Sequence, residues 1–301
     1  MFILSTSWNA SRHDNGSGIV NEIREAGFDT IELGFTLTEK IVKEILSLKD
    51  RGAIRVSSLH NICPLPPEIT PKDASPDFYS IASTDEAQRR LAIEAAKKTI
   101  DYTAAFGARV MVLHAGRVQI KDRTRDLAQL VGKDPDLALF RDEMIKERSE
   151  KSPEFLKNSI RSLKELAEYS KTKNVALAVE NRYYYREIPT FEEMKTVFGH
   201  FREGEIFYWH DVGHAEVFDR LGMARHKEIL DNFANRLIGV HLHDIIGVMN
   251  DHKAPGTGTF DFKLIRPYIG GDTLKVIEAH GPATAADLRR GVEYLGRILG
   301  R

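Results

Sequence analysis

Three features of the sequence predict an α/β protein folded as a (β/α)8 TIM barrel, in a single domain spanning residues 1–301. Short apolar runs alternate with stretches of helical periodicity, and eight such pairs follow one another along the chain. No Gly-x-Gly-x-x-Gly motif follows the first run, which favours a closed barrel over the alternative, an open doubly wound sheet. No low-complexity tract or close internal repeat marks a domain boundary.

The expected strands are mostly unbroken apolar runs, as in parallel strands that are buried on both faces. The first is too short and lacks the basic residues of a signal peptide, so it is interpreted as a strand. The eight strands are expected at Phe2–Ser7, Thr30–Leu33, Ile54–Leu59, Val110–Leu113, Val175–Val179, Ile206–Trp209, Leu237–Leu242 and Leu274–Ile277.

The expected helices have apolar residues three or four positions apart, and Gly27 and Gly107 end the first and the third of them. Proline is tolerated in the first turn of a helix, so Pro153 is expected to begin one. The helices are expected at Gly18–Ala26, Ile41–Leu48, Asp85–Phe106, Pro153–Ser170, Phe191–Phe198, His226–Phe233, Lys263–Tyr268 and Ala285–Leu299.

Two long loops are expected, after strands 3 and 4. Residues 61–83 contain five of the eleven prolines, and residues 116–152 are rich in charge, with one short helix expected near Leu137–Ile145. Both follow the carboxyl ends of strands, where barrel active sites lie, so they are expected to form walls or lids. A surface loop without function is the alternative.

The composition is that of an ordinary globular protein, with 42% hydrophobic and 29% charged residues. The formal net charge of −1 disfavours nucleic-acid binding, and binding through a local basic patch is the remaining alternative. No apolar run of about 18 residues is present, so no membrane association is expected. The single cysteine, Cys63, cannot form an internal disulfide, and a cytoplasmic location is therefore expected.

Polar side chains suited to metal binding follow nearly every expected strand. The carboxyl ends of barrel strands surround one mouth, and carboxylates that converge there repel one another unless a cation neutralises them. A divalent metal such as Mn²⁺, Co²⁺, Mg²⁺, Fe²⁺ or Zn²⁺ is therefore expected, and no organic cofactor. The strand-end residues are Trp8, Asn9, Glu32, His60, His114, Glu180, Asn181, Asp211, His214, His241, His243, Asp244, Asp251, His252, Glu278 and His280.

The other histidines are expected to have structural or surface roles. Because side chains alternate along a strand, His210 is expected to point away from the barrel interior and to have a packing role outside it. His13, His200 and His226 lie far from strand ends and are expected to face solvent. The pattern assigns no role to His280.

The motifs at the strand ends resemble those of the xylose isomerase-like TIM barrel superfamily, which contains sugar phosphate isomerases and epimerases and, more distantly, endonuclease IV. The resemblance covers nearly the whole barrel. The segments that carry it are Val110–Gly116, Ala178–Asn181, His210–His214, Gly239–Asp244, Pro255–Phe262 and Ile277–Glu278.

The resemblance implies one divalent metal held by Glu180, Asp211, His241 and Glu278. Endonuclease IV relatives hold three zinc ions, and the further positions match His60, His114, His214 and His252. Asn250 stands where that pattern has an aspartate, with Asp251 adjacent.

The resemblance favours a metal-dependent isomerase or epimerase acting on a small sugar, a polyol-derived ketone or a sugar phosphate. Glu180 and Glu278 would move a proton next to the substrate carbonyl. An abasic-site DNA endonuclease, or another metal-dependent lyase or hydrolase, is the alternative. A homo-oligomer is compatible with the sequence. Weaker candidates for substrate binding are Trp8, Asn9, Arg117 and Tyr183.

Overall fold

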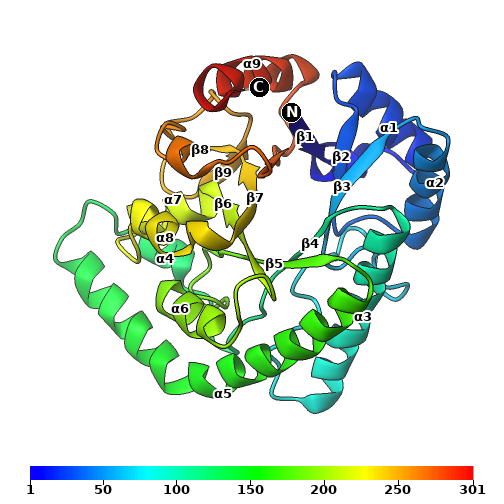
Figure 1. The fold of residues 1–301 in the computed structure, drawn as a ribbon. Helices are drawn as coiled ribbons and strands as arrows, with labels where there is room; N and C mark the ends of the chain where they lie inside the picture. Colours follow the sequence, from blue (N-terminus) through cyan, green and yellow to red (C-terminus); the bar gives the residue numbers. More distant parts are fainter. Residues whose placement is uncertain (301) are drawn as a thin grey trace.

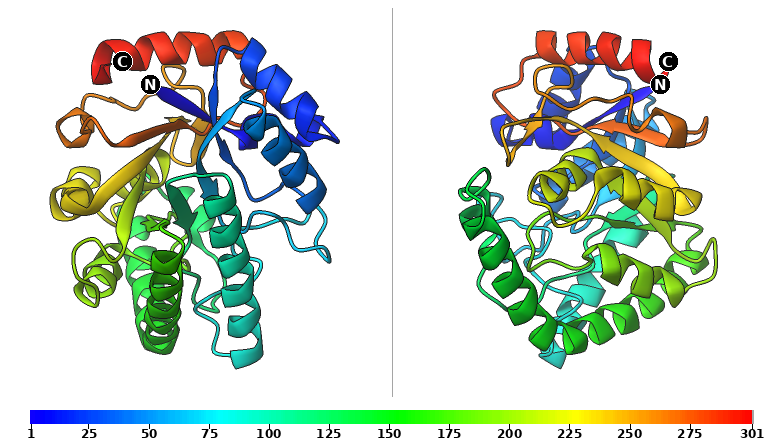
Figure 2. Two further views of the ribbon diagram at one scale, coloured as in Figure 1. Left: turned by 45° about the vertical axis from the view of Figure 1, so that its right-hand side comes forward. Right: turned by 90° about the vertical axis from the view of Figure 1, so that its left-hand side faces the viewer.

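The computed structural model describes residues 1–300, and within this range eight parallel strands close into a barrel (Figures 1 and 2). The first strand pairs with both the last and the second strand, which closes the ring and confirms the expected fold. The barrel strands, in their order around the ring, are β1 (Phe2–Ser5), β10 (Leu274–Ile277), β7 (Leu237–Leu242), β6 (Phe207–Asp211), β5 (Ala176–Glu180), β4 (Val110–Leu113), β3 (Arg55–His60) and β2 (Thr30–Leu33).

Helices cover the outside of the barrel, and a small antiparallel hairpin follows β7. Side-chain caps begin several helices, including capping boxes at Thr190 and Thr284. The hairpin consists of β8 (Asp244–Ile246) and β9 (Asn250–Lys253). The helices are α1 (Gly16–Glu25), α2 (Glu39–Asp50), α3 (Glu86–Ala105), α4 (Thr124–Ala128), α5 (Asp136–Thr172), α6 (Phe191–Gly199), α7 (Val212–Arg220), α8 (His226–Phe233) and α9 (Ala285–Leu299).

The long connection after β4 is mainly helical. The expected short helix and the expected helix from Pro153 are one element, α5, which curves around the outside of the barrel (Figures 1 and 2). The prediction that a helix begins at Pro153 is wrong. Proline removes the amide that would bond to the carbonyl of Ser149, but Ser149 is exposed, so water can satisfy that carbonyl.

The prediction that His226 faces solvent is also wrong, because its side chain is fully buried. Its ring stacks on Phe260, with centroids 5.0 Å apart, and its Nε2 lies 3.0 Å from Nε2 of His210. Helix α7, which periodicity did not indicate, supplies Glu216, 3.1 Å from Nδ1 of His226. His210 packs outside the strands, as expected.

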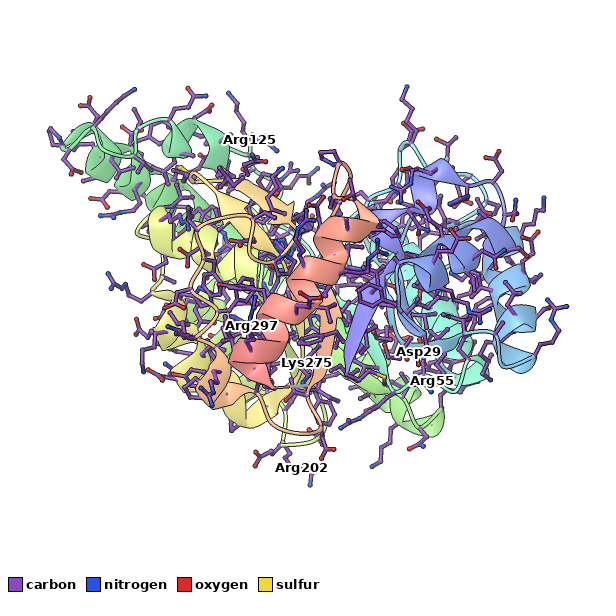
Figure 3. The ribbon with its side chains drawn as sticks, turned by 90° about the horizontal axis from the view of Figure 1, so that it is seen from above. Asp29, Arg55, Arg125, Arg202, Lys275 and Arg297 are labelled. Atoms are coloured by element: carbon purple, nitrogen blue, oxygen red, sulfur yellow. The ribbon has the colours of Figure 1, made fainter. Side chains whose placement is uncertain are left out.

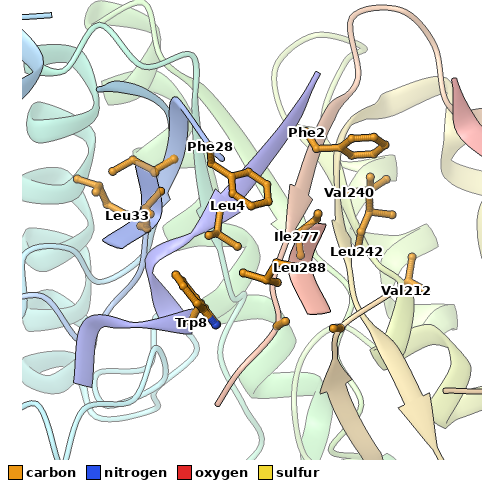
Figure 4. Packing of buried hydrophobic residues seen from close by; sticks show 14 of the residues in the cluster. Phe2, Leu4, Trp8, Phe28, Leu33, Val212, Val240, Leu242, Ile277 and Leu288 are labelled. Carbon is orange, nitrogen blue, oxygen red and sulfur yellow. The ribbon is translucent and has the colours of Figure 1, made fainter. Parts of the chain in front are cut away.

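Two apolar layers hold the barrel together. Between the strands and the outer helices, residues such as Leu4, Leu242 and Leu288 are fully buried (Figure 4). Inside the barrel, Trp209 packs among small and β-branched residues. Gly239 lies opposite the indole, and a Cβ atom at that position would be 2.1 Å from the ring.

Replacing Gly239 by alanine is expected to lower the free energy of unfolding by about 1–3 kcal/mol, because the added methyl group overpacks the barrel interior. Chemical denaturation measures the difference. Gly271→Ala is the matched control, since a Cβ atom there meets no atom within 4 Å. Equal stability of the two variants would contradict the packing described here.

The two ends of the barrel carry different groups. Asp29, Arg55, Arg202 and Lys275 lie near the amino-terminal ends of strands, whereas Arg125 lies at the opposite end (Figure 3). The end that bears Arg125 is the mouth at which the polar strand ends converge. No helix within residues 1–300 is long and apolar enough to cross a membrane.

Candidate metal centre

The structure brings together the four residues that the resemblance implied as metal ligands. Glu180 and Asp211 end β5 and β6, His241 lies within β7, and Glu278 directly follows β10. Neighbouring strands run in parallel, with Asp211 paired to His241, so these side chains point to the same layer. One potential donor atom from each lies within 4.8 Å of the others. Glu180, Asp211, His241 and Glu278 are called the main cluster.

Three carboxylates of the main cluster surround one imidazole nitrogen. Nδ1 of His241 lies 2.8 Å from Oε1 of Glu180, 3.0 Å from Oε2 of Glu278 and 3.6 Å from Oδ2 of Asp211. Burial alone would lower the pKa of His241, but Glu278, Glu32 and Glu180 raise it well above its usual value. The cluster therefore favours a positive charge at its centre.

A carboxylate behind His241 fixes the orientation of its ring. Oε1 of Glu32 lies 2.9 Å from Nε2 of His241, and Oε2 of Glu32 accepts a hydrogen bond from the Ser58 hydroxyl. Metal-binding histidines commonly donate their second nitrogen to such a carboxylate. This outer partner and the mixed nitrogen and oxygen donors fit a divalent metal ion.

Three further groups of potential ligands border the main cluster. One of them shares Asp211 and Glu278 with the main cluster and adds His243 and His252, and the other two are called accessory clusters. The first accessory cluster is His60, His114 and Glu180, and the second is His214, Asp251 and His252. Asn250 stands where the endonuclease IV pattern has an aspartate, but the neighbouring residue Asp251 supplies a carboxylate beside His214 and His252. These two clusters contain all four histidines that the endonuclease-like pattern singled out.

Glu180 belongs to both the main and the first accessory cluster because its two oxygens face different partners. Oε1 faces His241, whereas Oε2 lies 2.7 Å from Nε2 of His114 and 3.4 Å from Nε2 of His60. Burial alone would raise the pKa of Glu180, but the charge of His241 and hydrogen bonds from His114, His241 and His60 hold it well below its usual value. Glu180 is therefore ionised at neutral pH.

A stack of imidazole rings forms one side of the mouth. His252 lies between His243 and His280, with ring centroids 4.2 and 4.0 Å away. Nε2 of His243 is 2.9 Å from Oδ1 of Asp211, so the stack is joined to the main cluster. His280, to which the sequence assigned no role, thus lies at the edge of the site.

The weaker substrate-binding candidates lie in different surroundings. Tyr183 stands over the second accessory cluster, with its ring centroid 4.7 Å from that of His214. Trp8 and Asn9 are buried and make structural bonds: the Trp8 indole donates to the carbonyl of Ala283, and Asn9 donates to α1. Arg117 is half-buried near Asp77, whose pKa it helps to lower.

Sequence reasoning missed three charged residues at the mouth: Asp77, Arg182 and Glu187. Oδ2 of Asp77 lies 3.1 Å from Nδ1 of His114, and Arg182 contacts Glu180 and Glu187. Arg182 follows the end of β5 by two positions, a signal that could have found it. Asp77 lies in the proline-rich loop, where no periodicity points to it.

Asp244 also follows a strand but has a structural role. Its carboxylate accepts hydrogen bonds from the backbone amides of Gly256, Gly258 and Phe260. A Cβ atom at Gly258 would lie 2.4 Å from this carboxylate, so glycine is required there. The Pro-Gly-Thr-Gly motif therefore closes the loop after the hairpin.

A barrel whose mouth gathers buried histidines and carboxylates defines the class to which this chain belongs. The model of the xylose isomerase-like TIM barrel family matches residues 20–297, and the chain belongs to that family. The uncharacterized protein y4fM of Sinorhizobium fredii (strain NBRC 101917 / NGR234) is 24% identical over 287 residues, which cover 90% of this chain and 83% of y4fM.

Several solved structures share the fold over nearly their whole length. A D-tagatose 3-epimerase-like protein is 20% identical, with a TM-score of 0.71 and coverage of 99% of this chain and 96% of that one. D-Psicose 3-epimerase from Clostridium cellulolyticum H10, solved with D-tagatose, is 10% identical, with a TM-score of 0.69 and coverage of 100% and 99%. The 3-keto-D-glucoside 4-epimerase YcjR from E. coli is 15% identical, with a TM-score of 0.67 and coverage of 98% of both chains.

Proposed function

We propose that this protein is a metal-dependent isomerase or epimerase of a small sugar, a polyol-derived ketone or a sugar phosphate. The observation that carries the proposal is the main cluster, in which two glutamates from separate strands approach one imidazole nitrogen within 3.0 Å. The structural neighbours named as sugar epimerases support the substrate class, although their likeness to this chain concerns the fold.

The main cluster would hold the metal through Glu180, Asp211, His241 and Glu278. When bound, a divalent ion supplies positive charge that stabilises an oxyanion developing on the substrate. Glu180 and Glu278 belong to opposite ends of the strand run β5, β6, β7, β10, so a substrate between them meets two carboxylates. One would accept the proton from the carbon next to the carbonyl, and the other would return a proton.

The loops around the mouth would exclude water from the substrate. Asp77 from the proline-rich loop is buried against His114, so that loop forms part of the wall. Arg148 of α5 donates to the backbone carbonyls of Tyr185 and Glu187, which fixes the loop after β5. These contacts support the expectation that the two long connections form walls of the site.

Screening a panel of keto-sugars and their phosphates tests this function. Protein reloaded with Mn²⁺ or Co²⁺ is expected to convert at least one of them into an isomer of equal mass, detected by chromatography and NMR. A Glu180→Gln variant loaded in the same way should lose this conversion. A product that has lost water, or has been cleaved, would instead support the lyase or hydrolase alternative.

The two accessory clusters favour abasic-site endonuclease activity as a second candidate, because they supply the histidines of that pattern. The formal net charge of −1 argues against it, since duplex binding depends largely on Lys and Arg contacts to phosphates.

We therefore expect no cleavage of abasic duplex DNA by the metal-loaded protein at physiological salt. Gel electrophoresis of a labelled duplex with one abasic site provides the measurement, and duplex without that site is the control. Metal-dependent nicking that disappears in Glu180→Gln would make the endonuclease the better assignment.

A further inference from the structure

Arg182 is a buried cation that is fixed in place at the edge of the metal centre. Its side chain is only 8% exposed. Nη2 lies 3.1 Å from Oε1 of Glu187, and the other oxygen of Glu187 accepts a hydrogen bond from the backbone amide of Tyr184. Because Glu187 is itself tied to the loop backbone, the guanidinium has a defined position.

The guanidinium of Arg182 borders both accessory clusters. Nη1 lies 3.4 Å from Oε2 of Glu180, the oxygen that faces His60 and His114. The same Nη1 lies 3.3 Å from Nδ1 of His214, in the second accessory cluster. Arg182 does not contact Oε1 of Glu180 in the described hydrogen bonds, and that oxygen faces the main cluster.

A guanidinium at this place competes with a metal ion. It supplies the positive charge that neutralises Glu180, but it has no lone pair with which to coordinate a metal. A divalent ion among His60, His114 and Glu180 would be close to this fixed charge and would be repelled. The main cluster lies on the other side of Glu180 and is less affected.

We propose that Arg182 keeps a second divalent metal out of the first accessory cluster by taking the place of a cation beside Glu180. The inference rests on the proposed metal centre. It also implies that His60 and His114 bind no metal in the native protein and instead hydrogen-bond to Glu180.

The test is the number of metal ions per chain in protein stripped by a chelator, reloaded with excess Zn²⁺ and desalted. Inductively coupled plasma mass spectrometry gives the ratio, and native mass spectrometry checks it. The wild type is expected to hold one ion and Arg182→Met two. Arg182→Lys keeps the charge and should hold one.

Two controls connect a second ion to the proposed place. Arg125→Gln removes an exposed arginine from the same end of the barrel and should leave the ratio at one. Adding His114→Ala to Arg182→Met should return the ratio from two to one. A single ion in folded Arg182→Met, or two ions in the wild type, would overturn the inference.

If Arg182→Met does not fold, a second measurement on the wild-type protein still tests the inference. Isothermal titration of stripped wild-type protein with Zn²⁺ should saturate at one equivalent, and uptake of a second equivalent contradicts the inference. A wild type that binds no ion at all would refute the proposed metal centre itself. One ion in both the wild type and folded Arg182→Met refutes only the role of Arg182.

Discussion

Asp211→Asn is expected to lose most of the bound metal while the barrel stays folded. The amide keeps the size of the side chain but removes one of the carboxylates around His241, so the attraction for a divalent ion falls. His241→Ala should have the same effect because it removes the only imidazole of the main cluster. The measurement is metal content per chain after reloading and desalting, with circular dichroism as the check on folding.

Two further variants give the metal affinities with which this loss is compared. Glu32→Gln changes the carboxylate behind His241 and should lower metal affinity about 10–100-fold, less than the loss of a direct ligand. His200→Ala removes an exposed histidine remote from the mouth and should change nothing. Wild-type metal content in both Asp211→Asn and His241→Ala would show that the main cluster is not the binding site.

Glu278→Gln is expected to keep part of the metal but to lose the chemical step. The amide oxygen can still coordinate, whereas an amide cannot accept or return a proton at the substrate carbon. Loss of a general acid or base typically slows a reaction by about 10²–10⁴-fold. The rate of isomer formation, divided by the measured metal content, reports the effect.

Glu192→Gln is the matched control for this substitution, since Glu192 is an exposed glutamate on α6. Its rate should equal that of the wild type. If Glu278→Gln also turned over at the wild-type rate per bound metal, Glu278 would be a ligand without a role in proton transfer.

Strand geometry predicted the barrel and its polar mouth from the sequence, whereas the family resemblance implied the four residues of the main cluster. Parallel strands bring their carboxyl ends to one mouth, and side chains alternate between inside and outside, so a residue's position along its strand decides where it points. These two rules place Glu180, Asp211 and His241 at the mouth together with the other strand-end residues. No folding of loops is needed to bring them together.

The residues that were missed depend on loops and on distant packing. Asp77 reaches His114 only because the proline-rich loop turns back over the mouth, and no local pattern encodes that path. His226 is buried because α7 and Phe260 pack against it, although its own neighbours in the sequence are polar. Helix α5 continues through Pro153 because Ser149, whose carbonyl loses its amide partner, is exposed to water.

The most direct test of the proposed chemistry is incorporation of solvent deuterium into a panel of keto-sugars, measured by mass spectrometry. Wild-type protein loaded with Mn²⁺ in D₂O is expected to introduce one deuterium next to the carbonyl of its substrate, and treatment with a chelator should abolish the exchange. Exchange that persists after complete metal removal, or its absence with every sugar of the panel, would contradict a metal-assisted proton transfer at this mouth.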